Sequence, residues 1–185
     1  MIGNAIAGLY GGGVPPVAAT AYESIATSTV GSGGVSSVTF GSIPSTFTHL
    51  QIRYIARNSS LSSNTIMRFN GDSGSNYSTH YLLGNGSSAS AGAETSSTYI
   101  YTDILSATST SYAPAVIDIL DYANTNKYKT SRAIAGLDMN GSGTIWSVSG
   151  SWRNAAAITS ITLSIGAGFN FAEYSHFALY GIKGS

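Results

Sequence analysis

Short runs in which apolar and polar residues alternate recur along this chain. The clearest is ITLSI at 161–165, where the large apolar residues occupy one side and Thr162 and Ser164 the other. Side chains of a β-strand point alternately to its two faces, so this pattern predicts a strand with one buried face. The run THLQIRYIAR at 48–57 alternates in the same way and departs from the pattern at Ile55.

The segments between these runs are typical of turns. GSGG, NGDSGSN, GNGSSASAG, ANTN and NGSG supply residues that tolerate a positive φ or bond their own backbone. No convincing helical pattern follows residue 20, and no repeat of fixed period is visible. Many antiparallel strands in a chain of 185 residues predict an all-β fold, a jelly-roll-like antiparallel β-sandwich with an extended N-terminal arm.

The first twenty residues differ from the rest. We expect an N-terminal arm with a Gly/Pro joint at 1–20 and a β-sandwich domain at 21–185. GGG at 11–13 and PP at 15–16 predict a flexible joint followed by a stiff extended piece. The arm is either a frayed terminus or a contact to a neighbouring subunit. Its candidate contact residues are Ile2, Ile6, Leu9 and Tyr10.

Charged residues are few and balanced. Eight Lys or Arg and eight Asp or Glu give a formal net charge of zero, without a basic cluster, so no nucleic-acid partner is expected. No run approaches the roughly 20 apolar residues that span a bilayer, and the N-terminus lacks the basic start of a signal peptide, so no membrane partner is expected. The absence of cysteine suits folding in a reducing cytoplasm. A net charge near zero favours association, so we expect assembly.

The string GDSG around Ser73 also surrounds the nucleophilic serine of chymotrypsin-like proteases. Such a serine needs a histidine base and a third group that orients the histidine. In the chymotrypsin-like proteases these residues follow the chain order His, Asp, Ser. Here His49 is the one histidine before Ser73, and Asp72 is the one Asp between the two. His80 and His176 stay open as partners in space. The surrounding FNGDSG has the composition of a loop between two strands, and we favour that interpretation.

Other chemical interpretations have weak support. The three histidines share no metal-ligand spacing. DMNG at 138–141 begins like a calcium loop but lacks a later acidic ligand, and GNG at 84–86 precedes no helical pattern that a dinucleotide site needs. We therefore expect no enzyme activity, no metal and no cofactor.

Paired carboxylates for glycoside hydrolysis are a further alternative. The acidic residues available for it are Asp103, Asp118, Asp121 and Glu173. Asp118 and Asp121 follow a strand-like run into a turn, where we expect them to cap the chain or pair with Lys127, Lys129 or Arg132.

Aromatic residues offer a possible sugar platform. Trp146 and Trp152 fall on the same side of their run, which predicts that both are buried on one sheet face. Tyr77 and Tyr81 are expected on a loop, where they would contact a ligand or an adjacent subunit.

Three longer strings carry a resemblance to a known group of proteins. They are FGSIPSTFTHLQIRYIAR, VIDILDYANTNKYKT and the ending HFALYGIKG. They resemble small Gly/Ser/Thr-rich virion proteins of tailed phages, notably those of cyanobacteria and other aquatic bacteria. The resemblance runs from about Tyr22 to Gly184.

Some proteins of this group resemble capsid decoration (cement) proteins, jelly-roll sandwiches that assemble on the capsid, typically as trimers. The resemblance implies a structural protein of the virion's capsid surface, synthesised in the host cytoplasm. Its implied partners are the major capsid protein and itself, as a homotrimer, with the arm touching the shell or a neighbouring subunit. The alternative is a tail- or fibre-associated β-sandwich module that binds host surface glycan through Tyr77 and Tyr81.

Overall fold

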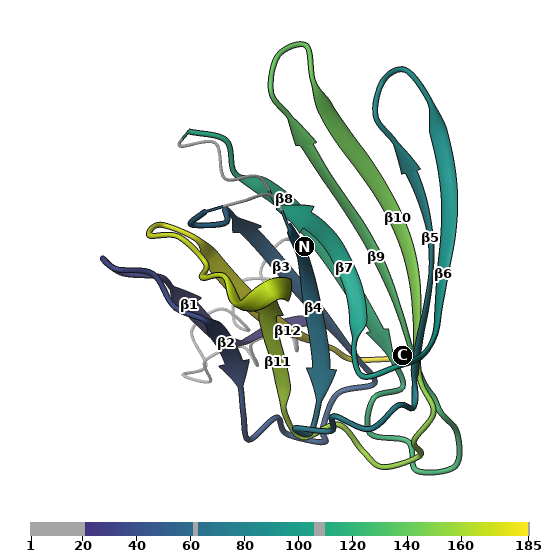
Figure 1. Cartoon of the computed structure of the whole chain (residues 1–185). Coiled ribbons are helices and arrows are strands. Elements are labelled where there is room, and N and C mark those ends of the chain that lie inside the picture. The colour runs from purple at the N-terminus through teal and green to yellow at the C-terminus, as the bar shows by residue number, and fades with distance from the viewer. Residues whose placement is uncertain (1–20, 61–62, 106–109, 185) are drawn as a thin grey trace, which may run out of the picture.

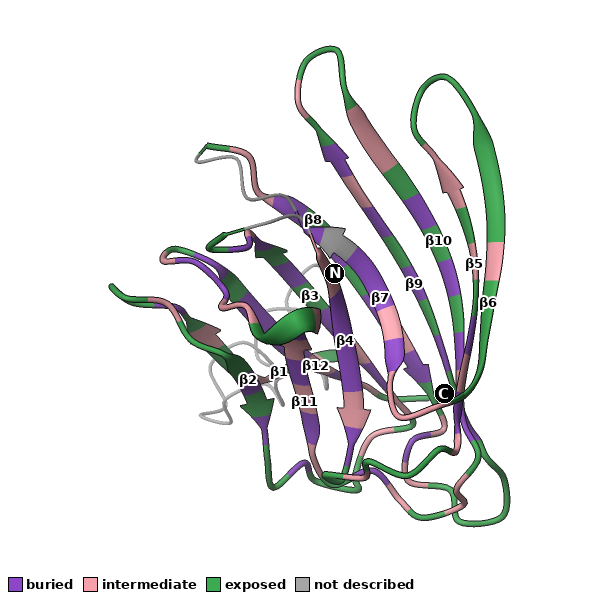
Figure 2. Cartoon of the chain, in the orientation of Figure 1, coloured by how far each residue is buried: buried purple, intermediate pink, exposed green. Residues whose placement is uncertain are grey.

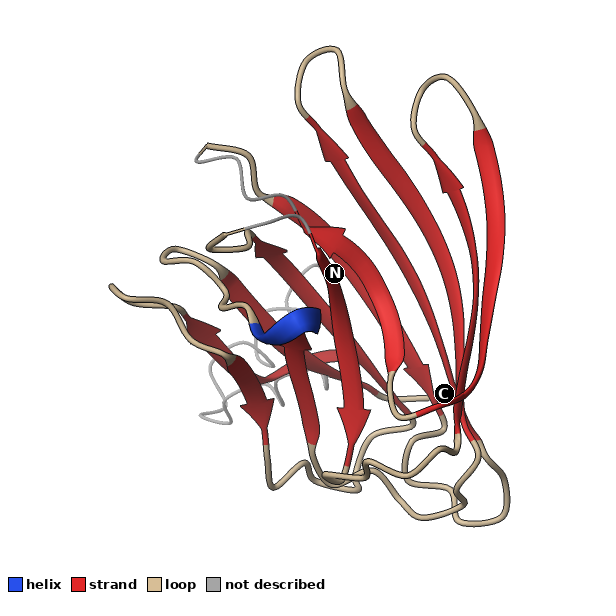
Figure 3. Cartoon of the chain, in the orientation of Figure 1, coloured by secondary structure: helices blue, strands red, loops and turns tan. Residues whose placement is uncertain are grey.

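Twelve strands and one short helical turn are found in a computed structural model that describes residues 21–60, 63–105 and 110–184. Figure 3 shows how completely strands dominate these residues. The strands are β1 (Tyr22–Thr29), β2 (Ser37–Phe40), β3 (His49–Ala56), β4 (Ser63–Phe69), β5 (Tyr77–Gly84), β6 (Ala89–Ser97), β7 (Ile100–Leu105), β8 (Ala113–Leu120), β9 (Lys129–Asp138), β10 (Gly143–Trp152), β11 (Ile161–Ile165) and β12 (His176–Ile182), and the helical turn is η1 (Gly166–Gly168). The arm, with Ile2, Ile6, Leu9 and Tyr10, lies outside the described residues.

Eight of the strands form a jelly roll. β1, β12, β3 and β8 are neighbours in one sheet, and β2, β11, β4 and β7 form the other. Numbered one to eight along the chain, these strands have the orders 1-8-3-6 and 2-7-4-5. Strand 1 thus pairs with 8, 2 with 7, 3 with 6 and 4 with 5, all antiparallel, as in one long hairpin rolled into two facing sheets. The fold predicted from alternation and turn composition is confirmed.

Two inserted hairpins widen one of the two sheets. β5 and β6 follow β4, β9 and β10 follow β8, and together they extend the larger sheet in the order β8-β9-β10-β5-β6. Figure 1 shows the two hairpins side by side, rising beyond the four-stranded sheet. The smaller sheet covers only the inner face of the larger one. Among the described residues no second layer covers the outer face.

The core lies between the sheets and follows the alternation of the strands. Every second residue of β9 is buried, and Figure 2 shows the resulting bands along β9 and β10. Ile161, Leu163 and Ile165 are buried on one side of β11, as the sequence predicts. Ile55, which breaks the pattern of β3, is 47% exposed because its side chain points to the outer face. Within the described ranges, no helix is long and apolar enough to cross a bilayer.

Candidate interaction surface

The loop around Ser73 is a turn held together by its aspartate. Asn70 and Gly71 have φ of 53° and 68°, and the Asp72 amide donates to the Phe69 carbonyl at 2.9 Å. The Asp72 carboxylate accepts bonds from the backbone amide of Gly74 at 2.8 Å and from the side-chain amide of Asn76 at 2.9 Å. The turn interpretation is confirmed, because GDSG supplies the left-handed backbone and the acceptor that close this loop.

The three histidines lie in three different strands, His49 in β3, His80 in β5 and His176 in β12. His49 Nδ1 accepts a bond from the Asp121 amide at 3.0 Å, and His176 Nδ1 bonds the Thr29 hydroxyl at 2.8 Å. His80 is exposed in the middle of β5, paired in register with Ser149 of β10. In the described part of the chain, none of them makes a hydrogen bond to Ser73. The structure therefore assembles no serine–histidine pair there.

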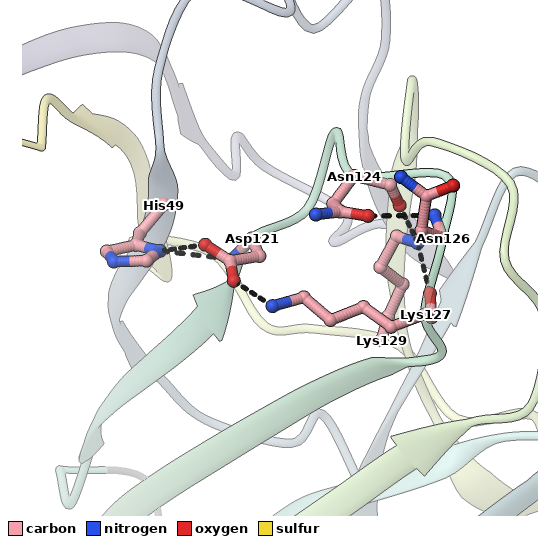
Figure 4. Close-up of polar contacts among 6 residues, drawn as sticks. All are labelled: His49, Asp121, Asn124, Asn126, Lys127 and Lys129. Carbon is pink, nitrogen blue, oxygen red and sulfur yellow. Dashed lines mark hydrogen bonds and ion pairs between the residues drawn. The ribbon is translucent and has the colours of Figure 1, made fainter.

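A polar cluster at one end of the large sheet joins β3, β8 and the loop before β9 (Figure 4). Asp121 forms an ion pair with Lys127 and lies 3.4 Å from His49 Nδ1, and hydrogen bonding from Lys127 lowers the pKa of the Asp121 carboxyl. The predicted pairing of Asp121 is confirmed. Asp118 instead accepts a bond from the Gln51 amide at 2.7 Å, although it is paired in register with Arg132.

Lys129 is fully buried and has a different role from the exposed Lys127. Its ammonium group donates to the carbonyl of Asn124 and to that of Lys127 at 2.9 Å (Figure 4). It also donates to the carbonyl of Ala155 at 3.0 Å. Burial lowers the pKa of the Lys129 ammonium group. Three carbonyls converging on one cation fasten two loops to each other, so this cluster is structural.

The remaining motifs are turns or buried groups. Asn85 of GNG accepts bonds from the amides of Ser87 and Ser88 in the β5–β6 hairpin, and Asp138 accepts one from Asn140 in the β9–β10 hairpin. No group of three His, Cys, Asp or Glu side chains that could hold a metal occurs in the ranges that the structure describes. Asp103 is 1% exposed, so its carboxyl group is removed from solvent.

The tyrosines expected on a loop lie in strand β5, so that expectation is wrong. Tyr77 is fully buried and stacks on Trp152 with a centroid distance of 6.2 Å. Tyr81 is half-buried and stacks on Trp146 at 4.8 Å. Positions 77 and 81 have the same parity in one strand, so both rings face inward. Trp146 and Trp152 are buried, as the sequence predicts.

The outer face of the large sheet carries exposed apolar residues that the strand register brings together. One row across the strands runs Val116, Ile134, Ser147, Leu82, Ala91, each residue paired in register with the next. The next row contains two sets of paired residues. Ile55 of β3 is paired with Pro114 of β8. Ile145 of β10 is paired with Gly136 of β9 and with Gly84 of β5.

We define the outer-face patch by the five large apolar residues of these rows. Their exposed fractions are 64% for Leu82, 62% for Ile145, 58% for Ile134, 47% for Ile55 and 38% for Val116. Val116 and Ile134 are paired in register, Ile145 lies diagonally to Ile134 and to Leu82, and Ile55 lies diagonally to Val116, so the five share one face of the sheet. Soluble proteins rarely leave such a surface uncovered, and contiguous apolar patches mark interaction sites.

A groove runs along the upper row of the patch. Gly84 and Gly136 have no side chains to fill this part of the sheet, and the open space of about 870 Å³ is bordered by Tyr112, Pro114 and Ile145. Below the patch a polar row, with Gln51, Asp118, Arg132, Ser149 and His80, forms its rim. An apolar centre with a polar rim is the usual layout of a protein–protein contact.

Among the strands that the structure describes, the patch continues to an edge of the large sheet. β6 is the last strand of the large sheet, and Figure 2 shows it exposed over most of its length. Its sequence, ASAGAETSS, has neither Lys nor Pro, the residues that usually protect an edge from pairing with another chain. The outer face and this edge therefore offer adjoining contact surfaces.

Compared with protein-family models, with curated proteins and with solved structures, the chain gives no match.

The outer-face patch is the feature that sequence reasoning missed. A usable signal was present in β9, where Ile134 alternates with the smaller Ala133 and Ala135. The alanines are buried and the isoleucine is exposed, the reverse of the arrangement expected from size alone.

Proposed function

We propose that this chain is a structural protein of a phage virion, a capsid decoration (cement) protein that attaches to other protein subunits through its outer-face patch. The patch is the observation that carries the proposal, because five exposed large apolar side chains lie together on one face of a protein with no net charge. The major capsid protein and further copies of this chain are the partners we propose.

The binding free energy that the patch can supply suits an attachment shared among several subunits. Burying a fully exposed Val, Leu or Ile side chain contributes about 1.5–3 kcal/mol, and these five are only partly exposed, so the patch supplies roughly 4–8 kcal/mol in gross terms. Association itself costs an estimated 4–15 kcal/mol or more. A single contact is therefore weak, and contacts repeated around an oligomer on a shell would add through multivalency.

Two further observations support a structural role. The jelly roll is a fold that viral capsid domains use, although it also hosts other functions. The three strings that resemble tailed-phage virion proteins cover β3, the β8–β9 connection and β12. The glycan-binding alternative has less support, because Tyr77 is fully buried and Tyr81 is half-buried and stacks on Trp146.

Co-sedimentation with capsids tests the proposal. Purified protein is mixed with shells of the phage that encodes it, and bound protein is measured in the pellet. The double variant Ile134→Ser/Ile145→Ser should lose most of the binding, while the control Tyr128→Ser, which alters a 58% exposed residue outside the patch, should bind like the wild type. Absence of wild-type binding, or equal binding by all three proteins, contradicts the proposal.

A further inference from the structure

Three Asn–Gly pairs lie in the connections between strands. They are Asn70–Gly71 after β4, Asn85–Gly86 after β5 and Asn140–Gly141 after β9. In such a pair the backbone nitrogen of the glycine can attack the side-chain amide of the asparagine, because glycine has no side chain that obstructs the approach. By sequence the three pairs are equivalent. The structure separates them by the hydrogen bonds that hold each asparagine side chain.

The side chain of Asn70 is fastened at both of its polar atoms. Its amide group donates to the Ala157 carbonyl at 2.8 Å. Its Oδ1 accepts bonds from the backbone amides of Thr159 at 2.8 Å and Ser160 at 3.1 Å. These partners belong to the segment before β11, so the bonds join two distant parts of the chain. Moving Asn70 Cγ to within bonding distance of the Gly71 nitrogen would disrupt them.

Asn85 is held by bonds within its own turn. Its Oδ1 accepts bonds from the backbone amides of Ser87 at 3.1 Å and Ser88 at 2.8 Å. The hydroxyl groups of the same two serines donate to this oxygen at 3.0 Å and 3.2 Å. Four donors on one atom fix the orientation of the side chain, so its rotation toward the Gly86 nitrogen costs these bonds.

Asn140 lies in the two-residue loop of the β9–β10 hairpin, which rises beyond the four-stranded sheet (Figure 1). Asn140 and Gly141 have φ of 54° and 111°, and the Met139 amide closes the loop on the Ser142 carbonyl at 2.8 Å. Both loop residues are exposed. In the part of the chain that the structure describes, neither the Asn140 side chain nor the Gly141 amide makes a hydrogen bond.

We propose that Asn140 is a site of spontaneous deamidation in the folded protein, and that Asn70 and Asn85 are protected from this reaction. The Gly141 amide loses its proton and its nitrogen bonds to Asn140 Cγ. The Cγ–Nδ2 bond breaks, and the side-chain nitrogen leaves as ammonia with that proton. Water then opens the cyclic imide, so the residue becomes aspartate or isoaspartate.

The reaction adds one negative charge to a chain whose formal net charge is zero. The new carboxylate lies in the hairpin loop whose Gly141 and Ser142 line the groove along the outer-face patch. The inference goes beyond the proposed function, because it concerns the chemistry of the chain itself and holds whichever partner the patch binds.

Peptide mapping of the full-length protein tests the assignment. The folded protein is incubated in mildly alkaline buffer, which favours loss of the glycine amide proton, and is then digested briefly with trypsin for tandem mass spectrometry. Asn140 is the one asparagine of the tryptic peptide 133–153, and fragment ions separate Asn70 from Asn85 within the peptide 69–127. Deamidation at Asn140 should be at least about tenfold faster than at either of the other two, because reaction there breaks no hydrogen bond.

The same incubation in guanidinium chloride is the control. In the unfolded chain the three pairs should react at similar rates, because the fold no longer distinguishes them. A second readout is isoelectric focusing of the folded protein. The wild type should gain an acidic form over time, and Asn140→Gln, whose longer side chain closes the ring far more slowly, should not.

Three results would overturn the inference. They are equal rates at the three sites of the folded protein, a faster reaction at Asn70 or Asn85, and an Asn140 that reacts only in the unfolded chain. Capsid shells play no part in these measurements, so their outcome leaves the proposed function to its own test.

Discussion

The carboxylate of Asp72 accepts a hydrogen bond from the indole N–H of Trp152 at 2.7 Å. This bond ties the β4–β5 loop to the last residue of β10, where the Trp152 ring also stacks on Tyr77. The bonds from Asn76, from the Gly74 amide and from Trp152 lower the pKa of the Asp72 carboxyl. Within GDSG, Asp72 therefore holds the loop in place, and Ser73 beside it is an exposed turn residue.

Replacing Asp72 should destabilise the protein. Asp72→Ala removes the shared acceptor of three donors and should lower the free energy of unfolding by about 2 kcal/mol. Ser73→Ala changes an exposed hydroxyl in the same turn and should stay within about 0.5 kcal/mol of the wild type. Urea denaturation at neutral pH compares the two, and an equal loss in both variants would contradict the anchoring role of Asp72.

Because of Asp103, the free energy of unfolding should fall as the pH rises. Burial raises the pKa of its carboxyl to about 6, above the ordinary 3.8, while the hydroxyls of Thr65 and Tyr54 act in the opposite direction. The folded state therefore holds this proton more tightly than the unfolded state. Its contribution is fully present below about pH 4 and is lost as pH rises through about 6, a change of about 3 kcal/mol.

The variant Asp103→Asn tests that pH dependence. It should flatten the fall in unfolding free energy between about pH 4 and 6, measured by denaturation at a series of pH values. Asp118→Asn makes the same chemical change on the outer face and should keep the wild-type slope. If the slope survives in Asp103→Asn, the buried carboxyl is not its source.

The Lys129 ammonium group should matter far more than that of Lys127. Lys129→Met leaves three carbonyls without their donor and should cost about 3 kcal/mol of unfolding free energy. Lys127→Met breaks an exposed ion pair with Asp121 and should cost at most about 1 kcal/mol. Thermal unfolding of both variants measures the difference. A larger loss in Lys127→Met would show that the ion pair, and not the carbonyl cluster, fastens these loops.

Gly150 should tolerate no side chain. A Cβ there would lie 2.5 Å from Ile100 Cγ2 and 2.6 Å from Ser131 Oγ, because β7 packs closely against β10 at this point. Gly150→Ala should therefore cost about 1–3 kcal/mol through overpacking. Gly41→Ala places its methyl group in open space and serves as the control. Chemical denaturation should separate the two variants, and equal stability would mean that the sheets can move apart without cost.

Alternation made the architecture predictable. The inward positions of β3, β10 and β11 follow from period-two burial, which is a local property of each strand, and Trp146, Trp152 and Leu163 are buried accordingly. The burial of Tyr77 is not predictable in this way, because the string before it is rich in turn residues and no local pattern shows that β5 begins at Tyr77 and turns its ring inward.

The outer-face patch was not predictable in the same way. Leu82, Val116, Ile134 and Ile145 lie in four different strands, and they meet only through the pairing of β5 with β10, β10 with β9, and β9 with β8. Strand order and register are long-range properties that no local pattern contains. Each residue alone is an unremarkable exposed apolar side chain, and the register makes them a surface.

A density map of the intact virion with this subunit located in it tests the central claim most directly. We expect copies on the capsid surface, with Ile134 and Ile145 of each subunit covered by another protein chain. A map in which the protein is absent from the particle, or is present with its outer face open to solvent, would contradict it.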